Sequence, residues 1–165
     1  MNDITNQVED TYLSFLVNDE LYAVNVGKAL EVHERQVITR VPNAPEYLKG
    51  IISFRGELVP VIETRLKLGL PERDDSDAFV IIVLELSTDE DRLIIGAIVD
   101  RVKDVIIIPR ENIKPVPKMK SSFNAQFLQG IAQYNQEFLM LLNVDKVFSE
   151  EEISILSDSL DLVKE

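Results

Sequence analysis

Residues 47–68 read YLKGIISFRGELVPVIETRLKL. Two short apolar runs, 50–54 and 58–62, flank the tripeptide Arg55-Gly56-Glu57. Ile, Val and Phe favour a pleated, half-buried surface, and a short connection that contains Gly is typical of a hairpin. The stretch therefore predicts a strand, a tight turn that carries a cation, and a second strand. Because Pro60 cannot donate to a strand ladder, its strand should lie at a sheet edge or carry a bulge there.

The same pattern returns at residues 127–148, which read FLQGIAQYNQEFLMLLNVDKVF. Four residues recur at a constant offset of 80 positions: Leu48, Gly50, Ile51 and Glu57 match Leu128, Gly130, Ile131 and Glu137. Two further segments repeat in the same order, since residues 26–32 resemble 99–105 and residues 38–42 resemble 113–117. Three matches in one order predict two halves that are built alike.

The repeat organises the whole chain of 165 residues, which is long enough for one domain or two small packed halves. We expect one domain over residues 1–165, with one barrel half at 12–70 and the other at 78–148, and an exchange of strands between them is left open. The two copies differ at the hairpin tip, where Arg55-Gly56 becomes Asn135-Gln136. A difference inside a repeat points to function more than to scaffold.

Composition excludes several classes of function. The chain has 29 acidic and 17 basic residues and a net charge of −12, so nucleic acid and anionic membrane surfaces are unfavourable partners. It contains no cysteine, which rules out disulfides, thiolate zinc sites and cysteine nucleophiles. No apolar run approaches the ~20 residues that span a bilayer, and residues 1–10 lack the basic start of a signal peptide. We therefore expect a cytoplasmic protein without direct membrane insertion.

Most of the chain reads as short strands. Residues 12–17 and 21–26 predict a hairpin around Asn18-Asp19-Glu20, and residues 29–32 favour a strand over a short helix. Residues 78–86 are so continuously apolar that their strand should be buried on both faces. Residues 93–99 and 105–108 predict further strands, with a bulge or a close approach at Gly96.

The connections are marked by proline, glycine and charge. Pro45 suits the start of a short helix through Leu48, and residues 63–68 predict one or two helical turns closed by Gly69 and Pro71. Residues 71–77, PERDDSD, form the clearest linker. We expect a disordered tail at 1–10, a charged turn at 88–92, a proline-rich connection at 109–118 and a loop at 119–126.

A helix should close the chain over residues 149–163. Ser149 and Glu152 have the spacing of a capping box, and Phe148 can pack on Ile153 as a hydrophobic staple. One face of this helix is apolar, formed by Ile153, Leu156, Leu160 and Val163. The fold class that follows is mainly β, with two small β-barrels packed side by side, a C-terminal helix and a groove between the barrels as the natural recognition site.

Motifs of catalysis are absent from the sequence. His33 is the single histidine, which leaves no two-histidine metal site, and its setting in Glu31-Val-His-Glu-Arg35 is that of a surface residue. Phosphate-binding loops, a nucleophile elbow and the spacing of a calcium loop are missing. The sequence thus favours a binding module without cofactor or metal over an enzyme. Arg55 is the strongest candidate for a contact residue, because arginine offers a planar donor fork and is enriched at interface hot spots; the alternative is a turn arginine that pairs with a nearby carboxylate.

From about residue 12 to residue 160 the chain resembles the CheW family of bacterial chemotaxis coupling proteins. The resemblance rests on segments in the first half: Tyr12-Leu-Ser-Phe15, Glu20-Leu-Tyr22, Lys28-Ala-Leu-Glu-Val32, Ile38-Thr-x-Val-Pro42, Ala44-Pro45, Gly50-Ile-Ile-Ser-Phe-Arg-Gly56 and Val59-Pro-Val-Ile62. It implies two SH3-like five-stranded barrels and no enzymatic activity. It also implies two partners, the cytoplasmic tips of methyl-accepting chemotaxis receptors and the regulatory domain of the histidine kinase CheA, which is itself similar to CheW.

The resemblance also implies which residues meet these partners. Arg55 and Gly56 match the family's Asn-Leu-Arg-Gly motif, whereas Ser53 and Phe54 depart from it. Glu63-Thr64-Arg65 stands where the family has Asp-Leu-Arg. Partner-binding residues are therefore expected at Lys28, Ala29, Glu31, Arg55 and Gly56, with Ala29 in place of a usual Val.

The expected function is a scaffold that couples chemoreceptors to CheA and supports receptor control of the kinase. An adaptor of a non-motility chemosensory pathway is an alternative that the departures from the motif leave open. A CheV-type adaptor would need an added phosphoacceptor domain, for which 165 residues leave no room. A small β-barrel enzyme or ligand-binding protein is the alternative from a different class.

Overall fold

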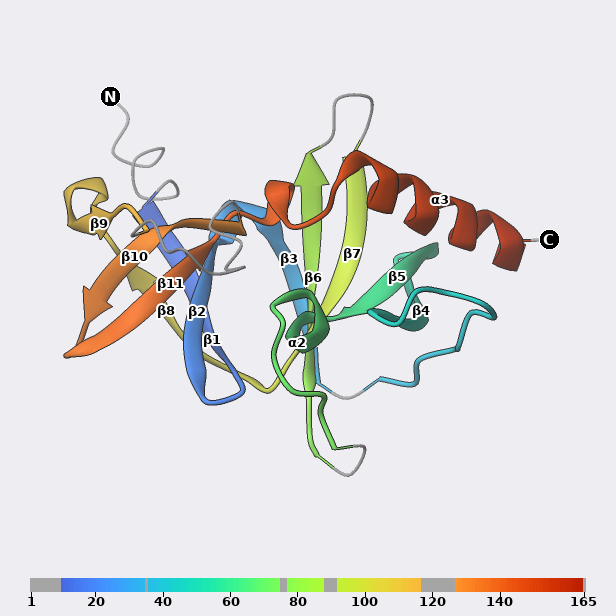
Figure 1. Ribbon diagram of the computed structural model, residues 1–165, viewed down its shortest axis with the longest axis horizontal. Coiled ribbons are helices and arrows are strands. Elements are labelled where there is room, and N and C mark those ends of the chain that lie inside the picture. Colours follow the sequence, from blue (N-terminus) through green and yellow to red (C-terminus); the bar gives the residue numbers. More distant parts are fainter. Residues whose placement is uncertain (1–9, 35, 75–76, 88–91, 117–126, 165) are drawn as a thin grey trace.

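The computed structural model describes residues 10–34, 36–74, 77–87, 92–116 and 127–164. Two β-sheets lie side by side, and a long C-terminal helix runs beside the second (Figure 1). The first barrel has the strand order β8 (Arg101–Ile107), β1 (Thr11–Val17), β2 (Glu20–Asn25), β11 (Glu137–Leu142), β10 (Leu128–Tyr134) and β9 (Ile113–Lys114). The second barrel has the order β3 (Ala29–Glu34), β6 (Val80–Ser87), β7 (Arg92–Val99), β5 (Glu57–Glu63) and β4 (Leu48–Phe54). The prediction of a mainly β fold of two small SH3-like barrels is confirmed, with the two-residue β9 as a sixth strand in the first sheet.

The barrels do not follow the two halves of the sequence. β1 and β2 lie in one sheet with β8–β11, whereas β3–β5 share the other sheet with β6 and β7. The chain crosses from the first barrel to the second at the 3₁₀ helix Val26–Lys28, and it returns at Asp100. Each barrel therefore contains strands from both sides of the linker at 71–77, so the halves 12–70 and 78–148 are units of the repeat rather than separate barrels.

The hairpins of the two copies of the repeat pair their strands in the same register. In β4–β5, Leu48 faces Ile62 and Gly50 faces Val61, with a bulge between Leu48 and Gly50. In β10–β11, Leu128 faces Leu142 and Gly130 faces Leu141, and the bulge lies at the same place. Each of the two glycines lies against a preceding segment of the same repeat, at Ile38-Thr39 and at Ile113-Lys114 respectively. The matches read from the sequence thus correspond to matching structure.

Tight two-residue turns close three of the hairpins. Their central residues all have positive φ: Asn18 and Asp19 between β1 and β2, Arg55 and Gly56 between β4 and β5, and Asn135 and Gln136 between β10 and β11. This backbone matches the right-handed twist of the flanking strands. β6 is buried along most of its length between β3 and β7, as its continuous apolar sequence predicts. A Cβ at Gly96 would lie 2.9 Å from Ile81, which confirms the close approach there.

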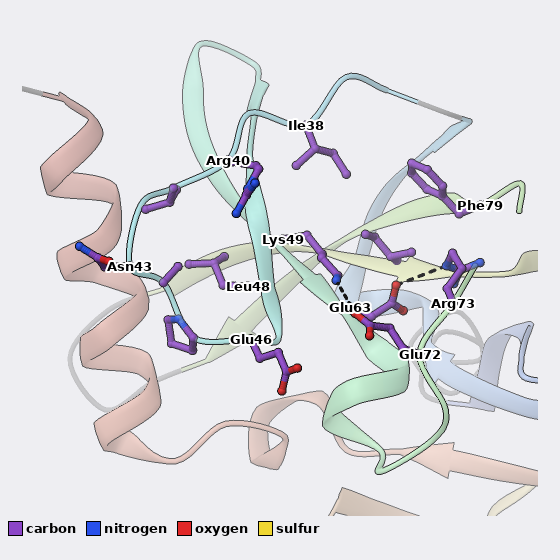
Figure 2. A pocket seen from close by; sticks show the side chains of 14 residues that line it. Ile38, Arg40, Asn43, Glu46, Leu48, Lys49, Glu63, Glu72, Arg73 and Phe79 are labelled. Atoms are coloured by element: carbon purple, nitrogen blue, oxygen red, sulfur yellow. Dashed lines mark hydrogen bonds and ion pairs between the residues drawn. The ribbon is translucent and has the colours of Figure 1, made fainter. Parts of the chain in front are cut away.

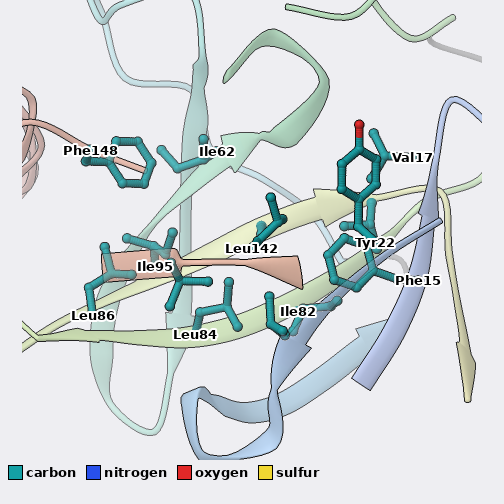
Figure 3. Packing of buried hydrophobic residues seen from close by; sticks show 14 of the residues in the cluster. Phe15, Val17, Tyr22, Ile62, Ile82, Leu84, Leu86, Ile95, Leu142 and Phe148 are labelled. Atoms are coloured by element: carbon teal, nitrogen blue, oxygen red, sulfur yellow. The ribbon is translucent and has the colours of Figure 1, made fainter. Parts of the chain in front are cut away.

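Within the described ranges, three groups of apolar side chains form the core. One lies within the first barrel around Leu139 and Leu141, and one lies within the second around Val61 and Val83. The largest spans the seam between the barrels, where Phe15, Val17 and Tyr22 meet Ile62, Ile82, Leu84, Leu86, Ile95, Leu142 and Phe148 (Figure 3). The shared seam makes the two barrels one packed unit.

A helix follows each of the two hairpins of the repeat, β4–β5 and β10–β11. The short α2 (Thr64–Lys67) comes directly after β5, as predicted, and Gly69 ends it with φ +73°. α3 (Glu150–Lys164) follows a 3₁₀ helix at Val144–Lys146, and another 3₁₀ helix at Arg110–Asn112 precedes β9. The capping box is confirmed, because the Ser149 amide donates to Glu152 at 2.9 Å and the Glu152 amide donates to Ser149 Oγ at 3.1 Å. Leu156 is fully buried and Ile153 packs on the seam core.

Two local predictions are wrong. Residues 45–48 form a turn, closed by a hydrogen bond from the Leu48 amide to the Pro45 carbonyl, and not a short helix. β5 lies between β7 and β4, so Pro60 is not on an edge strand. The pairing of β5 with β7 covers only Val61–Glu63, so the amide hydrogen that Pro60 lacks is not needed in that ladder. The nearby bulge is in the partner strand β4. The predictions for residues 1–9, 88–91 and 119–126, for part of the linker and for the side chain of Val163 lie outside the described residues.

Candidate functional surfaces

Arg55 occupies a strained position at the tip of β4–β5. Its φ is +51°, in the left-handed region that residues other than Gly, Asn and Asp rarely adopt. In the hairpin β10–β11, Asn135 occupies the same position, with φ +49°. Asn tolerates this backbone, whereas Arg does so at a cost. A strained residue that persists at an exposed turn motivates a functional interpretation.

The side chain of Arg55 lies over Phe54 and reaches β3. Its guanidinium carbon is 4.8 Å from the centre of the Phe54 ring, and Nη2 is 3.5 Å from Glu31 Oε2. The Arg55 side chain remains 67% exposed, so this ion pair is weak and the planar donor fork is accessible. Both contacts belong to the second barrel. Arg55 and both of its contacts therefore belong to the sheet of the second barrel.

The other expected contact residues divide into two groups. Gly56, with φ +80°, is exposed beside Arg55, and a Cβ there would meet nothing within 4 Å. Glu31 lies between Arg55 and His33, whose Nε2 is 3.3 Å from Glu31 Oε1. Together these residues make one surface, formed by Arg55, Gly56 and Glu31, which we call the Arg55 surface.

Lys28 and Ala29 lie elsewhere, where the chain crosses between the barrels. Lys28 Nζ contacts the Asp145 carboxylate at 3.0 Å and Ser87 Oγ at 2.9 Å. The same carboxylate accepts a hydrogen bond from the Ser87 amide. Ala29 packs against the seam core. Lys28 thus ties the crossing to β6 and to the 3₁₀ helix Val144–Lys146, and its ammonium is already engaged within the fold.

A second surface was not found from the sequence. Val37 is 87% exposed, and with Gln36, Ile38 and Phe79 it lines a shallow apolar hollow on the second barrel, which we call the Val37 surface. Ile38 and Phe79 also line a larger cleft of about 590 Å³, between residues 38–49 and the segment that carries Glu72 and Arg73 (Figure 2). The sequence feature that could have indicated this surface is the apolar pair at residues 37–38, which lies in a segment without a strand pattern.

Buried charges form the floor of this cleft. Glu63 is 2% exposed, and its carboxylate accepts from Arg73 Nε at 3.3 Å and from the Arg65 amide at 3.3 Å. Arg73 also lies 2.8 Å from Asp100 Oδ1, and Arg65 donates to Asp100 Oδ2 at 2.9 Å. Figure 2 shows the Glu63–Arg73 pair and, closer to the surface, Lys49 with Glu72. Each of these charges has an oppositely charged partner, and the network holds Arg73 of the linker against Glu63 and Asp100.

Asp100 completes the network at the point where the chain returns to the first barrel. Burial raises the pKa of its carboxyl, but hydrogen bonds from Arg65 and the Asn18 amide and the charges of Arg73 and Arg65 outweigh it, so the pKa lies below the usual value. Asn18 belongs to the β1–β2 turn, so Asp100 ties the first barrel to the second. The carboxylate is a structural anion.

The described residues contain no group of three or more His, Asp or Glu side chains that could hold a metal ion. His33 lies edge-on to Phe54 at 6.0 Å between ring centres and beside Glu31, which is a packing role. Among the helices in the described ranges, none is long and apolar enough to cross a membrane. The two surfaces differ in character, because the Arg55 surface carries an accessible arginine and the Val37 surface an exposed apolar side chain.

Comparison with known proteins shows the family to which this chain belongs. The family model of the CheW-like domain matches residues 11–152, so the chain belongs to the CheW-like domain family. A probable chemotaxis protein CheW of Rhizobium etli is 30% identical over 147 residues, which cover 89% of this chain and 92% of the relative. The chemotaxis protein CheW of Helicobacter pylori is 31% identical over 141 residues, covering 85% and 82%. The crystal structure of the scaffolding protein TtCheW from Thermoanaerobacter tengcongensis superposes with a TM-score of 0.75 at 29% identity, covering 85% of this chain and 88% of that one.

Proposed function

We propose that this protein is a non-enzymatic scaffold of bacterial chemosensory signalling, which couples chemoreceptors to the histidine kinase CheA and supports receptor control of the kinase. Membership of the CheW-like family supports the class of function. The observation that carries the proposal is the strained, accessible Arg55 beside Glu31, together with a separate apolar Val37 surface. A coupling protein needs two such surfaces, because it must hold two partners at once.

We assign the Arg55 surface to the receptor. A planar guanidinium can hold a carboxylate or backbone carbonyl groups of a helical tip in a fixed geometry, which lysine would do poorly. Arg55 already donates to Glu31, but this contact is long, at 3.5 Å, and a shorter contact with a receptor group can replace it. Gly56 leaves the approach to the turn open. Lys28 and Ala29 would support this surface indirectly, by fixing the start of β3.

We assign the Val37 surface to the regulatory domain of CheA. A valine that is 87% exposed next to a partly buried phenylalanine is the kind of apolar centre that a modest interface buries. Contact between an end of the second barrel and a kinase domain of similar fold would cover it. Both partners are proteins, so the proposal requires neither a cofactor nor nucleic acid nor membrane insertion, and it places the protein in the cytoplasm.

The receptor assignment is tested with Arg55→Ala. We expect receptor-dependent activation of CheA to fall roughly tenfold to a hundredfold, since a charge-assisted contact is worth roughly 1.5–3 kcal/mol. The melting temperature should change little, because Arg55 is exposed. The matched control is Arg92→Ala, which removes another exposed arginine of the second barrel, 75% exposed and paired with Glu85 at 3.2 Å. Normal activation by Arg55→Ala would contradict the assignment, and so would an equal loss in the control.

The kinase assignment is tested with Val37→Glu in a pull-down with the regulatory domain of CheA. A buried, unpaired carboxylate at the centre of an apolar contact should abolish measurable binding. Ile107→Glu is the control, because Ile107 is also exposed (63%) but lies on β8 of the first barrel. Unchanged binding by Val37→Glu would remove the Val37 surface from the proposal.

A further inference from the structure

The seam between the two barrels contains a small, partly open cavity of about 40 Å³. Its lining comes from both barrels and from the segments after the long hairpins: Phe15, Val24, Ile62, Thr64, Lys67, Leu68, Ile82, Leu84, Ile95, Ala97, Leu142, Val144, Val147 and Phe148. Figure 3 shows Ile62, Phe148 and Leu142 approaching from different elements around the same space. The seam is therefore filled less completely than the close packing expected of a protein core.

The chemistry of the lining decides what could occupy this space. All but Thr64 and Lys67 are apolar residues. A water molecule needs two to four polar partners, so an apolar cavity of this kind stays dry even when it is large enough. A molecule that carries a charge or a hydrogen-bonding group would lose its hydration there without compensation. The complementary ligand is small, uncharged and non-polar.

Lys67, one of the two polar residues in the lining, is held by an ion pair. Lys67 of α2 is 10% exposed at its side chain, and its Nζ contacts Glu152 Oε2 at 2.6 Å. The ammonium also faces three aromatic rings, at 4.9 Å from the centre of Phe148, 5.0 Å from Tyr47 and 5.6 Å from Phe127. Cation–π contacts of this kind help to compensate a largely desolvated ammonium. Because Glu152 lies in the first turn of α3, the pair joins α2 to α3 beside the cavity.

We propose that this cavity is a binding site for one small non-polar molecule, and that the Lys67–Glu152 pair is its gate. The site belongs to neither of the two protein-binding surfaces, so it goes beyond the coupling function and does not depend on it. A ligand that binds only the folded state would stabilise it by mass action and would fill the space shared by both barrels.

The test uses xenon as the probe, with the intact protein. Methyl groups that line the cavity, such as those of Ile62, Ile95 and Leu142, should show saturable chemical-shift changes as xenon pressure rises. Methyl groups of the separate barrel cores, Leu139 and Ile52, should not. Absence of any saturable shift at the seam would overturn the proposal, and so would equal shifts in all three cores.

Two variants locate the site and its gate. Ala97→Val adds two methyl groups to the lining and should weaken xenon affinity about fivefold or more, which corresponds to about 1 kcal/mol. Glu152→Gln weakens the ion pair, so xenon should exchange faster while its affinity for the cavity stays the same. Unchanged xenon affinity in a folded Ala97→Val protein would place the probe elsewhere, and an unchanged exchange rate in Glu152→Gln would remove the gate. The wild-type titration decides the site even if a variant fails to fold.

Discussion

The hairpins β4–β5 and β10–β11 share one backbone and carry different side chains. Both have the same register, a bulge after the first paired leucine, and a two-residue turn with positive φ at both positions. The first has Arg55-Gly56 at its tip and Glu63 at its end. The second has Asn135-Gln136 at its tip and Asn143 at its end. The leucine and glycine at the bulge are identical in the two copies, whereas the exposed tip residues and the residue at the end of each hairpin differ in charge.

This difference shows how a repeated unit divides its roles. After β5 the chain forms α2 and a buried network of Glu63, Arg65, Arg73 and Asp100. After β11, a 3₁₀ helix replaces α2, and Asp145 binds Lys28 at a partly exposed site. The first copy therefore holds the linker through buried charges, while the second joins the barrels through a weaker surface pair. Both hairpins build the scaffold, but the first also carries the strained arginine.

The largest effect is expected from Arg73→Met. Removing the guanidinium leaves Glu63, which is 2% exposed, without its charged partner, and breaking a buried pair costs roughly 3–5 kcal/mol. Chemical denaturation should show this as a lower free energy of unfolding. Lys28→Met, which breaks the pair at the second hairpin, should cost only about 0–1 kcal/mol because that pair is partly exposed. Equal costs for the two variants would mean that the hairpins are not specialised in this way.

A smaller effect should distinguish the two bulge glycines. Gly50 has φ +153°, and a Cβ there would lie 2.2 Å from the Thr39 carbonyl oxygen. Gly50→Ala should therefore destabilise by roughly 2–4 kcal/mol, through backbone strain and forced repacking. Gly130→Ala meets the Ile113 side chain at 2.5 Å and the Lys114 carbonyl oxygen at 2.7 Å. It lacks a positive φ, so roughly 1–3 kcal/mol is expected.

Denaturant titrations of both alanine variants check this order. Gly56→Ala is the control for backbone strain without crowding, because its φ is +80° and a Cβ there meets no atom within 4 Å. A larger loss for Gly130→Ala than for Gly50→Ala would show that side-chain crowding outweighs backbone strain at the bulge.

The pH dependence of stability should come in part from the network after the first hairpin. The pKa of Asp100 is lowered in the folded protein from an ordinary value of 3.8. A lowered pKa stabilises the folded state above the unfolded-state pKa, and this contribution is lost as pH falls through the folded-state pKa. Unfolding measured from pH 7 to pH 2 should therefore show a steep loss below about pH 4 that is shallower in Asp100→Asn. Parallel curves for the two proteins would exclude Asp100 as a source.

The repeated elements could be predicted from the sequence because their signals are local. Hairpin turns, the buried β6 and the capping box at Ser149 each depend on residues within a few positions of one another, and all are present. Pro45 misled the helix prediction because a proline at the start of a turn and at the start of a helix look alike until the following hydrogen bonds are known.

Spatial neighbours could not be predicted in the same way. The pairing of β3 with β6 and of β8 with β1 joins segments that the repeat places in different halves. Arg73 reaches Glu63 and Asp100 from a linker that reads as solvated charge. Arg55 was found because it differs between copies, whereas Val37 was missed because exposure of one valine depends on what folds over it.

The smallest effect on stability, and the sharpest on function, is expected from exchanging the tip residues of the two hairpins. Arg55→Asn relieves left-handed strain, but it loses the exposed ion pair with Glu31 and the contact with Phe54, so the two changes offset each other. The free energy of unfolding should change by less than about 0.5 kcal/mol. Asn135→Arg gains the strain without these contacts and should destabilise by roughly 1 kcal/mol.

Because Arg55→Asn keeps a turn residue that the other hairpin already uses, a loss of receptor-dependent kinase activation could not be assigned to misfolding. We expect that loss in Arg55→Asn and normal activation in Asn135→Arg, measured beside the free energy of unfolding of each variant. Normal activation by Arg55→Asn would make Arg55 a surface turn residue. Destabilisation of Arg55→Asn by more than about 2 kcal/mol would instead make its contacts with Glu31 and Phe54 structural, since exposed contacts of this kind rarely contribute so much.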